Sequence, residues 1–332
     1  MYNVAMGHSA GALLTTGVDN TLIGSLAGDA LTDADYNVAV GINALGSDTL
    51  GSRSVAVGRH ALATQNFTSA TNAYNTAVGY SAGIQVTTGI QNTLIGGDAG
   101  DALTSGKEHV AVGYEALSEE TNGHAATAIG YQALKAQNGS GAINTLNVAV
   151  GIQAGLDVTT GVQNTLIGSL SGSNLTDADF NVALGYRALH TDTLGSRSVA
   201  IGTEALFAQN FDSATATYNT AVGYQAGVAN TTGIQNTFVG GLAGDANTSG
   251  GANVAIGYGA LSAEDTGNRN VAIGNLALAA QNSNATNYNV AVGYAAGTAV
   301  TTGVENTLIG ALAGDANTTA ANNTNLGYQA GG

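Results

Sequence analysis

Polar and apolar residues alternate in a short block that recurs nineteen times along the chain. Its typical form is Asn-Val-Ala-Val-Gly, followed three residues later by alanine, as at 147–151 and Ala154. The glycines that end the blocks are Gly7, Gly24, Gly41, Gly58, Gly79, Gly96, Gly113, Gly130, Gly151, Gly168, Gly185, Gly202, Gly223, Gly240, Gly257, Gly274, Gly293, Gly310 and Gly327. Most steps are 17 residues, three are 21 and one is 19. Such a fixed short period predicts a solenoid in which each repeat forms one coil.

A longer rhythm overlies the short one. The 21-residue steps follow every fourth block, so four coils make a super-repeat of 72 residues. The residue four positions after each block glycine reads Gly, Gly, Leu, Leu through each complete super-repeat. We therefore interpret residues 1–332 as one solenoid segment with super-repeats 3–74, 75–146, 147–218 and 219–288 and a partial super-repeat 289–332.

The block itself predicts a β-strand. Valine, threonine and isoleucine are frequent in it, and β-branched residues suit a pleated, half-buried surface. Glycine recurs too often for helix interiors, where it costs about 1 kcal/mol. We expect two short strands and two turns in each coil, with turns at sequences such as Thr87-Thr88-Gly89. The prediction is an all-β parallel β-solenoid, or β-roll, whose nineteen stacked coils would span roughly 90 Å at the usual strand spacing.

The alternation within the block suggests an assembly of several chains. Its fourth position is aliphatic in all nineteen copies and is predicted to line the coil interior. Its third position then faces outward, yet it is almost always apolar, which predicts that a second copy of the chain covers it. We thus expect a parallel homo-oligomer with an interface that includes Leu22, Leu94, Leu166, Phe238 and Leu308.

Asparagine opens the block in fifteen of the nineteen copies. In stacked coils these amides would form a hydrogen-bonded ladder, as asparagine does in stacked sheets. Ligand contact is the alternative interpretation of this column. The ladder is favoured because the residue recurs with the structural period.

Composition excludes several classes of function. The chain has no cysteine, so it has neither disulfides nor cysteine-based metal sites. A net charge of −15 with only seven Lys and Arg residues argues against nucleic acid as a partner, and no apolar run predicts membrane insertion. We expect no catalytic, cofactor or metal site: no nucleophile or nucleotide motif occurs, and the aspartates of the turns are interpreted as solvated rather than as calcium ligands.

Two sets of residues are candidates for surface contacts. The longer coils insert residues after a Gln-Asn pair, which would place Asn66, Phe67, Asn138, Asn210, Phe211 and Asn282 on one edge. An aromatic ring beside amides suits a receptor glycan, although each Phe could instead fold back onto the coil, which is the favoured interpretation. The tyrosines that follow block glycines, such as Tyr80 and Tyr114, are interpreted as amphipathic residues that cover the coil edge.

The blocks 75–83 and 147–151 resemble the head repeats of trimeric autotransporter adhesins. They are also similar to the repeats of tail-fibre-like phage proteins that carry an endosialidase-type C-terminal chaperone. The resemblance covers essentially the whole chain, but the 17-residue coil is longer than is common in adhesin heads, and no stalk, anchor or chaperone sequence is present. The resemblance implies a left-handed β-roll, three parallel chains and a role in attachment.

These observations predict a structural shaft or head segment of a trimeric viral tail fibre or bacterial surface adhesin. Its partners would be two further copies of itself, neighbouring segments of a longer fibre and a surface glycan, and its location would be extracellular, on a virion or cell surface. The alternative is a lectin-like module whose repeat loops bind glycan. Ice binding is a weaker hypothesis, because pairs of threonines such as Thr87-Thr88 recur only once in four coils.

Overall fold

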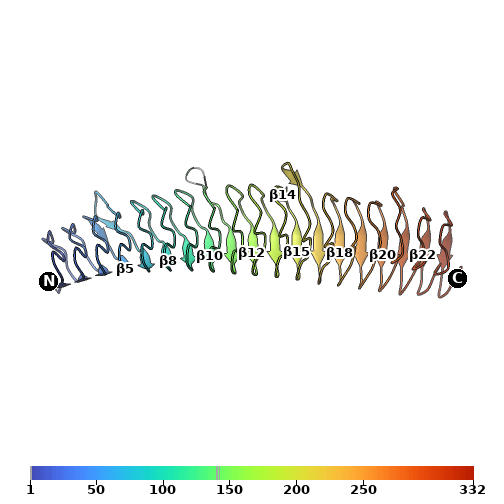
Figure 1. The fold of residues 1–332 in the computed structure, drawn as a ribbon, viewed down its shortest axis with the longest axis horizontal. Helices are drawn as coiled ribbons and strands as arrows, with labels where there is room; N and C mark the ends of the chain where they lie inside the picture. Colours follow the sequence, from blue (N-terminus) through green and yellow to red (C-terminus); the bar gives the residue numbers. More distant parts are fainter. Residues whose placement is uncertain (1, 140, 142) are drawn as a thin grey trace. The chain divides into compact units, whose positions relative to one another are not determined.

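The computed structural model describes residues 2–139, 141 and 143–332, which fall into two compact units, Met1–Asn164 and Thr165–Gly332. Within the described residues all regular secondary structure is β-strand, and no helix is present. The chain is an all-β parallel β-solenoid of about 19 coils with a 17-residue spacing, as the repeat predicted. Figure 1 shows the coils as successive loops, each carrying one strand of the main sheet.

Each coil of the first unit contributes one three-residue strand to the sheet. Every strand pairs in parallel with its copy in the next coil, and the equivalent block residues are opposite one another. The strands are β1 (Val4–Met6), β2 (Thr21–Ile23), β3 (Val38–Val40), β5 (Val55–Val57), β7 (Thr76–Val78), β8 (Thr93–Ile95), β9 (Val110–Val112), β10 (Thr127–Ile129) and β11 (Val148–Val150).

The second unit repeats this arrangement with the same register. Its strands are β12 (Thr165–Ile167), β13 (Val182–Leu184), β15 (Val199–Ile201), β17 (Thr220–Val222), β18 (Thr237–Val239), β19 (Val254–Ile256), β20 (Val271–Ile273), β21 (Val290–Val292), β22 (Thr307–Ile309) and β23 (Thr324–Leu326).

The prediction of two strands in every coil is wrong. Among the described residues a second strand forms only in two pairs of coils, β4 (Gly51–Ser52) with β6 (Thr71–Asn72) and β14 (Gly195–Ser196) with β16 (Thr215–Ala216). Elsewhere the described return path consists of turns with a few isolated parallel bridges, such as that between Lys107 and His124. The turns include non-glycine residues at positive φ, such as Leu45 at 53° and Tyr36 at 60°. These residues turn the backbone sharply enough to close a coil without a second sheet.

The predicted assignment of the two strand faces is also wrong. The middle residue of each strand, which is the third position of the block, points into the coil, and the aliphatic fourth position points outward. The residues predicted to form a chain–chain interface are fully buried within the single chain, with 0 % of their surface exposed; they are Leu22, Leu94, Leu166, Phe238 and Leu308. Because a second copy cannot reach them, the interface prediction does not hold for these side chains.

The asparagine column explains this reversal. Asparagine is polar, and it shares a strand face with the third position, which places it on the inward face. Asn20 is nevertheless 1 % exposed, because its side chain satisfies backbone groups on two sides. Its Nδ2 donates to the Ala34 carbonyl across the coil (2.7 Å), and its Oδ1 accepts from the backbone N–H of Asn37 in the next coil (2.9 Å). The predicted ladder therefore exists, but most of its bonds join side chain to backbone.

Core packing accounts for the change from glycine to leucine at the turn position between adjacent coils. A Cβ atom on Gly83 would lie 2.6 Å from Leu94 Cδ1, and one on Gly100 would lie 2.8 Å from Leu94 Cδ2, so Leu94 fills the space that two glycines leave. In the following coil the sizes are exchanged, because the strand supplies Ala111 and the turn supplies the buried Leu117. The Gly, Gly, Leu, Leu rhythm is thus complementary to the residue in the strand centre.

Candidate functional site

The longer coils place their phenylalanines in the protein interior. Phe67 is 6 % exposed and Phe211 is 8 % exposed, so these rings fold back onto the coil and offer little surface to a ligand. The asparagines of the same loops are more accessible: Asn210 is half-buried, and the exposed members are Asn66, Asn138 and Asn282. Any contact at these loops would therefore be made by amide groups rather than by aromatic rings.

Each longer loop is anchored on a buried carboxylate that the sequence analysis did not single out. Asp48 is 0 % exposed and accepts hydrogen bonds from Gln65 Nε2 (2.6 Å), Gly51 N (3.0 Å) and Phe67 N (3.2 Å). Gln65 Oε1 in turn accepts from Asn75 Nδ2 (2.8 Å). The equivalent pairs are Glu120 with Gln137, Asp192 with Gln209 and Glu264 with Gln281. A signal was present in the sequence, because an acidic residue precedes the glutamine that opens each of the four longer loops by 17 positions. Glu115 and Gln132 have the same spacing without opening such a loop.

The hydrogen-bond partners of these carboxylates lie within the protein itself. Burial raises the pKa of Asp48 and Asp192, and the hydrogen bonds from the loop act in the opposite direction. The acceptor oxygens are directed at backbone and amide donors of the protein itself. Their effect is to fix the start of each inserted loop.

The outer face of the sheet is a regular surface that recurs from coil to coil within each unit. Its residues are the first and third of every three-residue strand; the first is valine or threonine and the third is an aliphatic residue. Ile95, Ile129 and Leu184 are 39, 38 and 41 % exposed. Among the strands that the structure describes, none contributes a charged residue to this outer face, although the chain carries a net charge of −15.

Tyrosines extend the apolar surface beside the outer face. Tyr80, Tyr114 and Tyr131 directly follow block glycines, and between 47 and 55 % of their surface is exposed. The rings of Tyr114 and Tyr131, on adjacent coils, stack with centroids 5.9 Å apart. The prediction that these residues cover the coil edge agrees with this arrangement, but much of each ring stays accessible.

Besides the outer face and the tyrosines, the residues that immediately precede the blocks form a column on the surface. In the first super-repeat Arg53 lies over the ring of Tyr36 (4.8 Å to the centroid) and that of Tyr74 (6.0 Å). In the third super-repeat Arg197 lies over Phe180 (5.1 Å). At these two places the column therefore sets an arginine against aromatic rings of adjacent coils.

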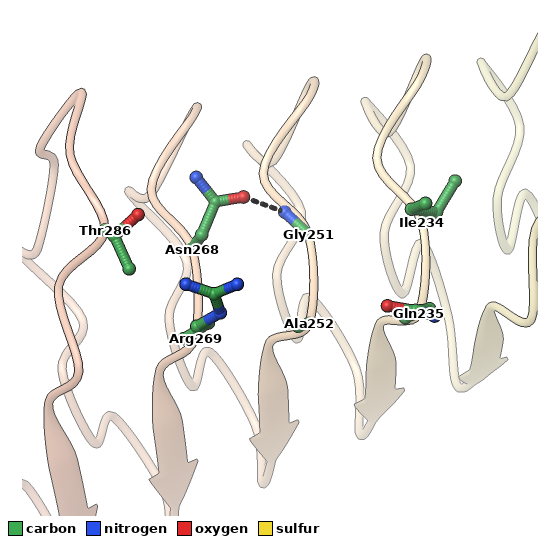
Figure 2. Close-up of a pocket in the computed structure, with 7 residues that line it drawn as sticks. All are labelled: Ile234, Gln235, Gly251, Ala252, Asn268, Arg269 and Thr286. Atoms are coloured by element: carbon green, nitrogen blue, oxygen red, sulfur yellow. Dashed lines mark hydrogen bonds between the residues drawn. The ribbon is translucent and has the colours of Figure 1, made fainter.

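In the second unit the same column contains a depression of about 220 Å³. It is lined by Ile234, Gln235, Gly251, Ala252, Asn268, Arg269 and Thr286. Figure 2 shows Ala252 between the side chains of Arg269 and Gln235, with Asn268 Oδ1 bonded to the backbone N–H of Gly251 (2.7 Å). The depression exists because Gly251 and Ala252 carry little or no side chain.

Within the described part of the chain no three His, Asp or Glu side chains converge as metal ligands, and no helix has the length and apolarity needed to span a membrane. Comparison with known proteins finds neither a family model nor a curated sequence that matches the chain. The functional interpretation therefore depends on the surfaces of the molecule.

Proposed function

We propose that this protein is a structural segment of a trimeric surface fibre, either a viral tail fibre or a bacterial adhesin, and that it mediates attachment outside the cell. The observation that carries the proposal is the uncharged outer face of the sheet, whose third strand position is aliphatic in coil after coil. Regular apolar surface on a protein of strong net charge is typical of an interface. Resemblance of the repeat blocks to adhesin heads and phage fibres supports the attachment role and the number of three chains.

Identical coils favour parallel association of identical chains. When copies lie parallel and in register, each outer-face residue meets side chains from the equivalent coils of its partners. Aliphatic residues then face aliphatic residues at every level, as a closed rotational symmetry requires. The acidic residues remain in turns away from this face, where they keep the assembly soluble.

The test is the mass of the purified protein by light scattering at several dilutions. The proposal expects about three times the chain mass of 32.6 kDa. A mass equal to one chain at micromolar concentration would contradict it. A glycan array probed with the same sample addresses the attachment role separately.

A lectin-like module is the second candidate, and a specific observation favours it. Asn66, Asn138 and Asn282 are exposed on loops anchored once per super-repeat, so amide groups recur along one edge within each unit. Replacing the exposed asparagines with alanine should abolish glycan capture if the loops are the binding surface. Unchanged capture would leave the loops as structural insertions.

A further inference from the structure

The residue column before the blocks carries a cation–aromatic unit in the first and third super-repeats and an incomplete copy of it in the fourth. In the second super-repeat the equivalent residues are Glu108 and Ala125, so the unit is absent there. Arg53 and Arg197 each lie beside an aromatic ring from the preceding coil, Tyr36 and Phe180 respectively. Arg269 is the equivalent arginine of the fourth super-repeat, but the position equivalent to Phe180 is Ala252. The depression at Arg269 is therefore the space that a ring fills in the other two copies.

Arg269 keeps a partner on one side only. Its guanidinium lies over the Tyr288 ring (5.5 Å to the centroid), and its Nη1 donates to the Tyr288 hydroxyl (2.9 Å). Nε and Nη2 donate to no other described residue, and no carboxylate of the described chain lies within 4.0 Å of the guanidinium. A planar carboxylate is the group that best pairs with two free donors of a guanidinium.

The rest of the lining supplies hydrogen-bonding groups around a small apolar patch. Gln235 and Thr286 are exposed and their side chains make no hydrogen bond to another described residue, and Asn268 keeps one Nδ2 hydrogen free beyond its bond to the Thr266 carbonyl (3.1 Å). Ala252 and Ile234 form the apolar part. The hydroxyls of a sugar ring can form hydrogen bonds with these amide and hydroxyl groups, which an aromatic hydrocarbon ring cannot do.

We propose that the depression at Arg269 binds one carboxylate-bearing sugar, a uronic acid residue of an acidic glycan. The carboxylate accepts hydrogen bonds from Arg269 Nε and Nη2, the sugar ring fills the space over Ala252, and its hydroxyls bond to Gln235 and Thr286. This inference rests on the proposed attachment function, for which it names the class of receptor.

The experiment measures binding of methyl β-glucuronide to the intact protein by saturation-transfer NMR and calorimetry, with neutral methyl β-glucoside as the comparison. We expect glucuronide to bind at least tenfold more tightly than glucoside. Absence of glucuronide binding, or equal binding of both sugars, would overturn the proposal.

Two variants test the position of the site. Ala252→Phe installs the ring found at Phe180, and the backbone allows it because φ is 56° at Ala252 and 60° at Phe180. We expect this variant to lose glucuronide binding with an unchanged or higher melting temperature. Arg269→Gln should weaken binding at least tenfold, whereas the control Arg197→Gln, which changes the arginine already covered by Phe180, should leave it unaltered. Glucuronide binding that persists in Ala252→Phe would place the site elsewhere.

The outcomes separate this site from the proposed function. A protein that attaches to surfaces but ignores glucuronide refutes the site and leaves the attachment role. A protein that binds glucuronide but neither attaches to glycan surfaces nor forms an oligomer keeps the site and refutes the fibre proposal.

Discussion

At the scale of single residues, the block glycines are required by the distance between stacked coils. Gly96 has a φ of 137°, and a Cβ atom there would lie 2.3 Å from the carbonyl oxygen of Gly113 in the next coil. Neither the backbone conformation nor the spacing permits a side chain. The recurrence of glycine is thus a packing requirement of parallel stacking.

Adjacent glycines in one coil provide a matched test. We expect Gly96→Ala to lower the free energy of unfolding by at least about 2 kcal/mol, from backbone strain and overlap with Gly113. Gly97→Ala should change it by no more than about 0.5 kcal/mol, because the nearest atom is a mobile ring carbon of Tyr114 at 3.4 Å. Urea unfolding of both variants measures the difference; equal stabilities would contradict the stacking argument.

His109 shows how another residue takes the place of the block asparagine. It is fully buried, its Nε2 lies 2.7 Å from the Gly123 carbonyl, and its Nδ1 accepts from the Ala126 N–H (3.2 Å). These two bonds reproduce those of an asparagine side chain and require the neutral ring with its proton on Nε2. Burial lowers the pKa of His109, against smaller opposing effects of the Gly123 carbonyl and Glu120.

This substitution makes stability depend on pH with a defined sign. The unfolded chain protonates His109 near its ordinary pKa of 6.5, while the folded chain keeps it neutral to lower pH. The unfolded state therefore binds more protons below about 6.5, and the free energy of unfolding falls as the pH drops from there towards the lowered folded pKa. Thermal melts of the wild type and His109→Asn at pH 7.5 and 5.5 check this, and we expect the wild type to lose more stability on acidification. A parallel loss in both proteins would refute it.

At the scale of the coil, the large side chain that fills the core comes from the strand in one coil and from the turn in the next. Leu94→Ala should cost about 2–5 kcal/mol, the usual range for a truncated core leucine. The double variant Leu94→Ala, Gly100→Leu copies the next coil, which pairs Ala111 with Leu117 at the same φ of 55° as Gly100. We expect it to recover much of the loss, and Gly100→Leu alone to destabilise by overpacking. Additive effects in this double-mutant cycle would contradict complementary packing.

The longer loop that contains residues 68–70 is the second element for which the structure predicts the effect of a mutation. Residues 68–70 are exposed, and in the preceding coil Leu50 is followed at once by Gly51, the pairing partner of Thr71. Deleting 68–70 should therefore change the free energy of unfolding by less than about 1 kcal/mol. Asp48→Ala should cost about 3 kcal/mol or more, because Gln65 and two backbone N–H groups lose a buried acceptor. Differential scanning calorimetry distinguishes them, and a deletion as damaging as Asp48→Ala would contradict this account.

At the scale of the whole molecule, the outer face and not the strand centre is the surface available for assembly. Ile95→Glu with Ile129→Glu places charges on exposed positions, so each chain should keep its β-structure by circular dichroism while the oligomer dissociates. Light scattering reports the mass. By contrast, Leu94→Asp should unfold the coil itself, because that residue is 0 % exposed. An intact oligomer in the double glutamate variant would exclude this face as the interface.

The sequence by itself determined the number of coils, their parallel register and the asparagine ladder. Those features follow from spacing alone, since stacking places equivalent residues of successive 17-residue repeats beside one another. Counting positions was enough for these features, and no knowledge of side-chain volume was required.

Only the tertiary structure decided which strand face is inside. Both strand faces are apolar, so the alternation of residues along the strand could not distinguish the inner face from the outer one. The structure shows that the block asparagine can be buried, because its side chain has hydrogen-bond partners across the coil and in the next coil. The same limit applies to the Asp48 network and to the depression at Arg269. Each of these features depends on how side chains from different coils occupy the same space. The sequence of a single coil does not specify that space.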